Sequence, residues 1–161
     1  MNSPYMGNFF VSQKFSNTHN GLDLVGLDSK EIHATVNGIV HYAGWENPNN
    51  HLQGFGQYVC IRSESTGKYY YYGHLSEIKV KTGDYISITD VIGIEGSTGH
   101  STGSHLHYEC RPKFCKGDYC DIVSISGIKN ELTTIQNDGY ITSNPEKFIQ
   151  CPCCNKKFFL R

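Results

Sequence analysis

The chain has 161 residues, with 14 Lys and Arg, 15 Asp and Glu, and a net charge of −1 at pH 7. That length fits one domain of ordinary size with a hydrophobic core and room for a small appendage. The charges are balanced and spread without blocks, which argues against nucleic acid as the main partner, because phosphate binding needs a concentrated basic surface. No stretch approaches the roughly 18 apolar residues of a membrane span.

Short apolar and aromatic segments recur along the first 112 residues. Seventeen glycines and eleven tyrosines are typical of short strands joined by many turns. The segments that predict strands are, in chain order, 8–12, 35–44, 56–62, 67–74, a tight hairpin at 80–86, a buried strand at 91–96, and a last strand opening at Leu106. None carries a helical period, so we expect a mostly β, compact antiparallel domain over residues 1–112, with few short helices.

Residues 113–161 have a different, cysteine-rich composition. We expect a small C-terminal extension, either part of the same compact unit or a separate appendage. Its one helix signal is a start at Ser143 or Asn144 as cap, with Pro145 in the first turn.

Seven cysteines are dense usage for this length. Cys60 and Cys110 fall in predicted strands, where we expect buried thiols. The stretch 151–154 looks like one knuckle of a zinc ribbon, with Cys151 and Cys154 as ligands and Cys115 and Cys120 as the partner pair. The sequence does not decide whether these cysteines bind a second, structural zinc, form disulfides or remain reduced thiols.

Two histidines flank a leucine in the stretch STGSHLHYEC, residues 101–110. Side chains alternate along a strand, so His105 and His107 point the same way and Leu106 points into the core. The pair could be two metal ligands, a ligand beside a catalytic base, or plain surface residues.

Further polar residues suggest a site. His19 and Asp23 are four apart, and His74 ends the tyrosine-rich segment. Zinc takes imidazole nitrogen and carboxylate oxygen, and a catalytic zinc keeps three protein ligands plus an open position for water. Two histidines and one aspartate are an acceptable set, which leaves two histidines for acid–base work.

The joint pattern carries a resemblance. The stretches VSQKFSNTHNGLDLVG, VNGIVHYAGW, YYYYGHLS and VKTGDYISITDVIGIEGSTGHSTGSHLHYE resemble, in order and spacing, the lysostaphin-like (LytM-type) zinc endopeptidases that cut peptidoglycan cross-bridges. The resemblance covers about residues 8–112 and implies the duplicated hybrid motif fold with a substrate groove. It also implies that His19, Asp23 and His107 bind zinc and that His74 and His105 are catalytic.

The chemistry fits these implied roles. Zinc lowers the pKa of bound water from 15.7 to about 7, which makes hydroxide available at neutral pH. His105 could take the proton of the water, and His74 could stabilise the oxyanion or protonate the leaving amine; the sequence does not decide between them. Glu109, on the face of His107, could orient a ligand histidine or be a salt-bridged surface residue.

Two further segments could border the groove. Tyr70 and Tyr72 are expected on the face of His74, where they would line a groove for an extended peptide, although ordinary strand packing is the alternative. The loop GSTGHSTGS lacks the Lys of a phosphate-binding loop and is expected to form a groove wall, with His100 solvated.

These features predict a monomeric zinc metalloendopeptidase that hydrolyses stem peptides or cross-links of bacterial peptidoglycan. The rivals are a non-catalytic, zinc-containing wall-binding or scaffold relative and a metal-binding regulatory domain. The first residues lack the basic and apolar segments of a secretory signal, so the protein is made and held in the cytoplasm, leaves by another route, or has had a signal trimmed away. We expect action at the cell wall, as a bacteriophage lysin released by lysis or a virion-borne wall hydrolase.

Overall fold

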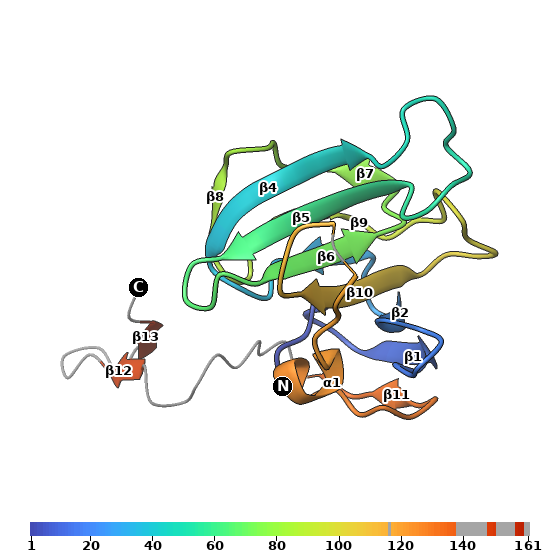
Figure 1. Ribbon diagram of the computed structural model, residues 1–161. Helices are drawn as coiled ribbons and strands as arrows, with labels where there is room; N and C mark the ends of the chain where they lie inside the picture. The colour runs from blue at the N-terminus through green and yellow to red at the C-terminus, as the bar shows by residue number, and fades with distance from the viewer. Residues whose placement is uncertain (116, 138–147, 151–156, 160–161) are drawn as a thin grey trace.

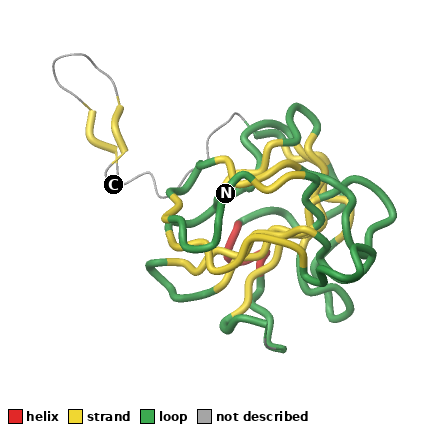
Figure 2. The backbone as a smooth tube through the Cα atoms, turned by 90° about the horizontal axis from the view of Figure 1, so that it is seen from above, coloured by secondary structure: helices red, strands yellow, loops and turns green. Residues whose placement is uncertain are grey.

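The structure is a computed structural model that describes residues 1–115, 117–137, 148–150 and 157–159. Strands and loops make up nearly all of this part of the chain, and one short helix accompanies them (Figures 1 and 2). The elements are β1 (Phe9–Gln13), β2 (Leu22–Gly26), β3 (Glu31–His33), β4 (Gly38–Trp45), β5 (Gln57–Ser63), β6 (Tyr69–Gly73), β7 (Glu77–Ile78), β8 (Tyr85–Ile86), β9 (Val91–Ile94), β10 (Leu106–Arg111), α1 (Ile122–Ser126), β11 (Thr134–Ile135), β12 (Phe148–Gln150) and β13 (Lys157–Phe159).

The strands form one large and two small sheets. The large sheet has the order β11-β1-β2-β10-β6-β5-β4-β8, the second sheet has the order β3-β9-β7, and β12 pairs with β13. Every strand pairing in the described residues is antiparallel. The predicted mostly β, antiparallel fold is therefore confirmed.

The hydrophobic core lies against one face of the large sheet. Alternation along β10 sends Leu106 and Tyr108 inward, and both side chains are fully buried. Ile32 of β3 and Ile92 of β9 belong to the same core cluster, so the second sheet covers this face. Burying these apolar side chains stabilises the fold by about 1.5–3 kcal/mol each.

The opposite, outer face of the large sheet carries a second aromatic cluster. Tyr58 and Cys60 of β5 pack there with Tyr71 of β6, and Phe55 and Phe114 lie against them from neighbouring loops. Because β10 pairs with β6, the outward residues of β10 continue this face. A polar row and an aromatic cluster thus lie side by side on one surface.

The segment 80–86 is not the tight hairpin that the sequence predicts. A turn does close between Lys81 and Asp84, with the Asp84 amide 3.0 Å from the Lys81 carbonyl oxygen. The flanking strands then separate: β7 pairs with β9, and β8 pairs with β4. The predicted turn is present, but local sequence does not show that the segments on its two sides pair with different strands.

Six short strands of the described residues were not predicted: β2, β3, β7, β11, β12 and β13. The segment of β2 follows Gly21 directly and lies in the middle of the large sheet between β1 and β10. The strand segments predicted at 8–12, 35–44, 56–62, 67–74 and 91–96 overlap β1, β4, β5, β6 and β9.

Part of the region after residue 112 packs on the main core. Ile122 of α1, Ile128 and Ile135 of β11 are core residues, and β11 pairs with β1. Asp121 caps α1 by accepting hydrogen bonds from the amides of Val123 and Ser124. The division of the chain at residue 112 stays a prediction, and the helix start at Ser143 or Asn144 lies outside the described residues.

In the described part of the chain, no helix is long and apolar enough to cross a membrane.

Candidate metal and catalytic site

Strand β10 presents a row of polar side chains on the outer face of the large sheet. His107 and Glu109 alternate with the buried Leu106 and Tyr108, as the two-residue period of a strand requires. His105 stands one residue before the strand, in an isolated bridge with Gly96. The predicted inward leucine between two outward histidines is therefore confirmed.

Strand β2 brings the aspartate to this row. Asp23 is directly opposite His107 in the pairing of β2 with β10. His19 lies in the loop before β2, four residues ahead of Asp23. Gly21 allows this approach, because a Cβ there would come within 2.7 Å of the Tyr108 carbonyl oxygen and 2.9 Å of the His107 ring. Gly21 thus marks a close approach of the backbone to β10.

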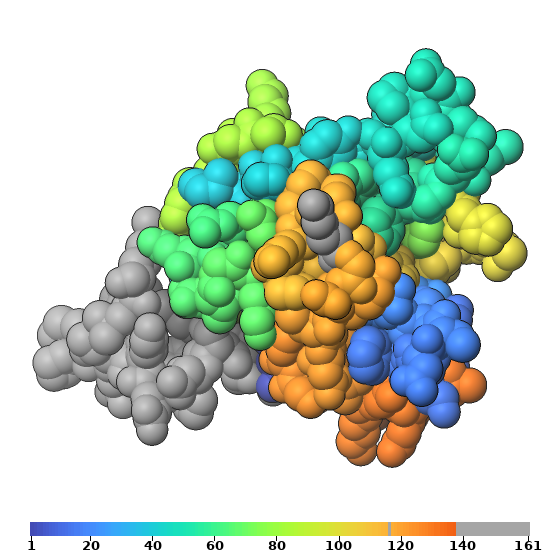
Figure 3. Space-filling view, in the orientation of Figure 1, coloured from blue at the N-terminus to red at the C-terminus, as the bar shows by residue number. Residues whose placement is uncertain are grey.

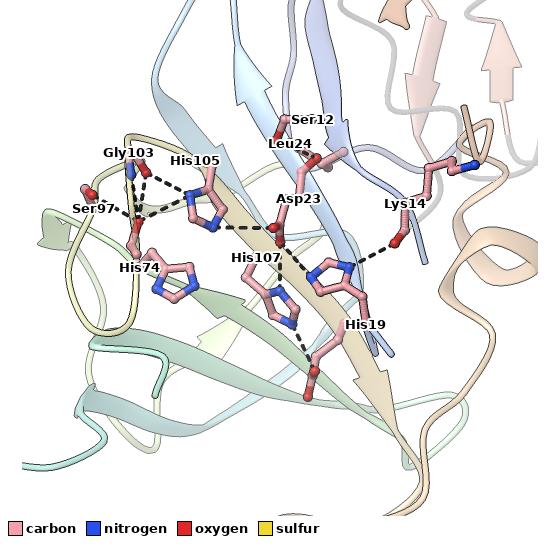
Figure 4. A network of polar contacts seen from close by, with 12 residues as sticks. Ser12, Lys14, His19, Asp23, Leu24, His74, Ser97, Gly103, His105 and His107 are labelled. Atoms are coloured by element: carbon pink, nitrogen blue, oxygen red, sulfur yellow. Dashed lines mark hydrogen bonds and ion pairs between the residues drawn. The ribbon is translucent and has the colours of Figure 1, made fainter. Parts of the chain in front are cut away.

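Three of these side chains converge as a possible metal site (Figure 4). The His107 Nδ1 and His19 Nε2 atoms lie 2.8 Å and 3.2 Å from Asp23 Oδ1. One ligand atom from each of the three lies within 4.8 Å of the others, and the described residues contain no second group of this kind. Zinc bonds of about 2.0–2.2 Å in a tetrahedron separate ligand atoms by roughly 3.3 Å, so this donor set fits a zinc ion.

The remaining ring nitrogens are held by acceptors. His19 Nδ1 lies 3.0 Å from the Lys14 carbonyl oxygen, and His107 Nε2 lies 3.0 Å from Glu109 Oε2. A carbonyl and a carboxylate accept hydrogen bonds, so each ring donates from that side and turns its other nitrogen toward Asp23. Glu109 is buried, not a surface residue, and its second oxygen accepts from Arg111.

His74 and His105 lie beside this trio. Their ring centroids are 4.6 Å apart, and the His74 ring is 6.0 Å from that of His107. His74 Nδ1 lies 2.7 Å from the Thr98 carbonyl oxygen, and His105 Nδ1 lies 2.8 Å from that of Gly103. The structure thus brings all five residues of the predicted site together.

Charges and burial set the protonation of the site. Burial raises the pKa of Asp23, but hydrogen bonds from His107 and His19 outweigh it and hold that pKa well below its usual value. Burial lowers the pKa of His107, yet hydrogen bonds to Asp23 and Glu109 raise it to about 9. Burial lowers the pKa of His74 to about 4, so its ring is neutral at pH 7.

The five side chains line an open cavity of about 590 Å³. Gln13, Thr18, Glu46 and the segment 100–102 complete its polar walls, and Phe55 and Arg111 border it as well. The loop predicted as a groove wall does line the cavity. His100 belongs to that lining and is exposed.

Tyr70 and Tyr72 do not line the cavity, which corrects the prediction that they form a groove. Both are buried in the core on the inner face, and the Tyr72 hydroxyl bonds Thr35. His74 has a positive φ of 63° and follows the last residue of β6, so the alternation that placed it with these tyrosines ends before it. The tyrosines of β6 on the outer face are Tyr69 and Tyr71.

The predicted second zinc gains no support among the described residues. Cys60, Cys110, Cys115 and Cys120 are free thiols there, and Cys60 and Cys110 are buried as expected. Cys120 packs against the inner core, whereas the Cys115 amide bonds the Tyr71 hydroxyl of the outer cluster. The partners proposed for this pair, Cys151 and Cys154, lie outside the described residues, so this zinc stays a prediction.

Fold and site together define a β-sheet protein with a His-Asp-His group suited to zinc and two further histidines beside it. The model of Peptidase family M23 matches residues 17–121, and the chain belongs to this family. In sequence it is 35% identical over 91 residues to lysostaphin of Staphylococcus simulans and 34% identical over 115 residues to the DD-carboxypeptidase/endopeptidase Mpg of Neisseria meningitidis.

Solved structures agree with this family. The catalytic domain of lysostaphin superposes with a TM-score of 0.60 at 30% identity, over 68% of this chain and 80% of that one. The catalytic domain of the prophage-encoded M23 protein EnpA of Enterococcus faecalis gives 0.60 at 27% identity, over 74% and 93%. The matches cover 56% and 71% of this chain but only 17% and 24% of full-length lysostaphin and Mpg.

Proposed function

We propose that this chain is a zinc-dependent endopeptidase that hydrolyses peptide bonds of bacterial peptidoglycan. The observation that carries the proposal is the convergence of His19, Asp23 and His107 in one cavity with His74 and His105. Membership of family M23 supports peptide hydrolysis, and a relative named for its substrate, the peptidoglycan DD-endopeptidase ShyA of Vibrio cholerae, supports peptidoglycan as substrate.

His19, Asp23 and His107 would hold the zinc through Nε2, a carboxylate oxygen and Nδ1. When bound, zinc supplies a Lewis acid that acidifies a water and polarises the scissile carbonyl. Glu109 accepts from His107 Nε2, so the proton that zinc would displace from this ring is the one on Nδ1. The chain's own work is then to move protons between water, peptide and leaving amine.

His105 is the better placed of the two histidines to take a proton from the reacting water. Its Nδ1–H is held by Gly103, so Nε2 is free for the reacting water, and Asp23 Oδ2 lies 3.6 Å from that Nε2. The carboxylate stabilises the imidazolium that forms when the proton arrives. The same imidazolium can then protonate the leaving amine.

His74 suits a different task. Its Nδ1–H is donated to Thr98, and its pKa of about 4 keeps Nε2 unprotonated at neutral pH. A neutral Nε2 accepts a hydrogen bond, so we assign it to orienting the water or the leaving amine. The alternative role of His74, stabilising the oxyanion, would need a proton on Nε2, and burial of the ring disfavours that protonated form.

The finer assignments are part of the proposal. We place the site of action at the bacterial cell wall and take the protein to act as a monomer. A bacteriophage source is supported by the structural similarity to the prophage-encoded EnpA. The bond that is cut, in a stem peptide or in a cross-bridge, is left to experiment.

Two variants and purified cell walls test the proposal. Wild-type protein loaded with zinc should release peptide fragments that mass spectrometry detects, and a chelator should abolish the release. His105→Ala should lose cleavage while keeping one zinc per chain, whereas His107→Ala should lose both. Retained cleavage in either variant contradicts the assigned roles. Zinc binding without any cleavage by the wild type would instead indicate the non-catalytic wall-binding alternative.

A further inference from the structure

Among the residues that the structure describes, Arg111 is the single Lys or Arg side chain in the lining of the catalytic cavity. It is the last residue of β10 and faces outward with Glu109 and His107, which lie two and four residues before it. The remaining charged side chains of that lining, apart from histidines, are the carboxylates of Asp23 and Glu46. The cavity therefore has one fixed cationic point beside the candidate catalytic residues.

Aromatic rings hold this guanidinium in place. Its Cζ lies 4.9 Å from the ring centroid of Tyr71, 5.0 Å from that of Tyr119 and 5.5 Å from that of Phe55. Figure 3 shows the segment that follows β10, in orange, lying across this face of the molecule. Cation–π contacts on several sides restrict the side chain, so little rotamer entropy remains to be lost when a ligand binds.

The fork of the guanidinium is open to a ligand. Arg111 Nε donates to Glu109 Oε1, and within the described residues Glu109 is its one hydrogen-bond acceptor. The four terminal N–H donors have no protein partner there, although the side chain is only 14% exposed. Because these N–H donors are largely shielded from water, a ligand that accepts hydrogen bonds strongly is favoured. A carboxylate accepts two parallel hydrogen bonds from the guanidinium fork.

Phe55 lies between Arg111 and the candidate metal site and shows how far apart the two are. The Phe55 ring lies 5.6 Å from the His107 ring and 5.5 Å from the Arg111 guanidinium carbon. An extended peptide advances about 3.3–3.6 Å per residue, so the guanidinium is within about three residues of the candidate metal site. A peptide lying in the cavity can therefore reach both at once.

We propose that Arg111 is a substrate-binding residue that holds a free carboxylate of the peptide substrate within about three residues of the scissile bond. Glu109 positions the guanidinium through Nε, and Phe55 and Tyr119 form its walls. This inference rests on the proposed function and adds a substrate class to it: peptides with an ionised carboxylate near the cut are preferred over the same peptides with a carboxamide.

The test uses soluble peptide fragments of peptidoglycan in two forms, with free carboxylates and with the same groups converted to carboxamides. Zinc-loaded wild type should cleave the carboxylate form with a kcat/KM higher by about 10-fold or more, mostly through KM, since hydrogen bonds to charged groups contribute about 1.5–3 kcal/mol. Arg111→Gln should bring the ratio of the two forms close to one. Arg111→Lys should keep part of the preference, because it retains the charge but loses the fork.

Arg62→Gln is the matched control. Arg62 is an exposed arginine of the same sheet, outside the cavity lining, and its loss should leave the preference unchanged. The ratio separates substrate binding from a purely structural role, because the loss of charge balance at Glu109 would lower cleavage of both forms in the same proportion. Equal cleavage of both forms by the wild type, or an unchanged ratio in Arg111→Gln, overturns the inference.

A binding measurement keeps this inference distinct from the proposed function. Calorimetric titration of the metal-free protein with the carboxylate and carboxamide forms should show tighter binding of the carboxylate form, with the difference lost in Arg111→Gln. If the zinc-loaded wild type cleaves neither form, the proposed function fails, and the binding difference still decides the role of Arg111. No difference in binding overturns it.

Discussion

His74 and His105 lie with ring centroids 4.6 Å apart, and each donates its Nδ1–H to a carbonyl of one loop, at Thr98 and at Gly103. A single loop therefore fixes the tautomer of both rings and leaves both Nε2 atoms available in the cavity (Figure 4). Two ring nitrogens side by side suit the handling of one water and one leaving amine.

His74→Ala is expected to lower kcat by about 10²–10⁴-fold, as removal of a proton-handling or water-orienting group does. Zinc content should stay at that of the wild type, because His74 is not among the three converging ligands. Since the two histidines act on the same steps, the His74→Ala, His105→Ala double variant should fall little below the weaker single variant. Full activity of His74→Ala, or loss of its zinc, would contradict this role.

Glu109→Ala should weaken zinc binding by about 10–100-fold, because the acceptor that sets the tautomer of His107 is lost. Glu109→Gln should lose less, since its amide oxygen can accept the same hydrogen bond from Nε2. Competition titrations against a chelator of known affinity measure both variants. If the two variants bind zinc equally well, hydrogen bonding by Glu109 is not what tunes the site.

Gly21→Ala should distort the metal site from outside it. Its Cβ would meet the Tyr108 carbonyl oxygen at 2.7 Å and the His107 ring at 2.9 Å, and the carbonyl belongs to a central strand that yields little. We expect a loss of about 1–3 kcal/mol in stability together with weaker zinc binding. Gly117→Ala, with nothing within 4 Å of the added methyl group, serves as the control and should match the wild type in both.

Glu95 is a buried carboxylate that ties the histidine loop to the rest of the fold. Its two oxygens accept hydrogen bonds from the Tyr5 hydroxyl at 2.5 Å, the Gly26 amide at 2.7 Å, Lys30 Nζ at 2.8 Å and Ser104 Oγ at 2.6 Å. Ser104 directly precedes His105. Glu95→Gln should therefore lower the free energy of unfolding by about 1–3 kcal/mol and reduce kcat through a less ordered His105.

The Glu95 contribution depends on pH. Burial raises the pKa of Glu95, but hydrogen bonds from Lys30, Ser104 and Tyr5 outweigh it and lower that pKa below 4.5. A lowered carboxyl pKa stabilises the fold above the unfolded value, and this stability is lost as the pH falls through the folded value. Urea denaturation between pH 7 and 3 should show the wild type losing more stability below pH 4.5 than Glu95→Gln does. Parallel curves for the two proteins would show that Glu95 does not titrate in this way.

The sequence predicted the five site residues and missed much of what surrounds them. His19, Asp23, His74, His105 and His107 stand in a spacing that resembles a known family. Phe55 and Arg111 carry no such signal. The cavity borders on them only because β6 pairs with β10 and an aromatic loop packs on the outer face. Glu95 was not singled out either, since its four partners come from distant parts of the chain.

Local sequence by itself determined the alternation of strands and turns, the outward pair around Leu106, and the kinds of donor atom available for a metal. These depend on short-range rules, the two-residue strand period and the chemistry of each side chain. The tertiary structure alone decided which strands pair, and so it placed Asp23 opposite His107, buried Tyr70 and Tyr72, and set Arg111 beside the cavity. The reason is that pairing and burial depend on residues far apart in the chain, and even the direction of His74 depends on a backbone turn that no local period predicts.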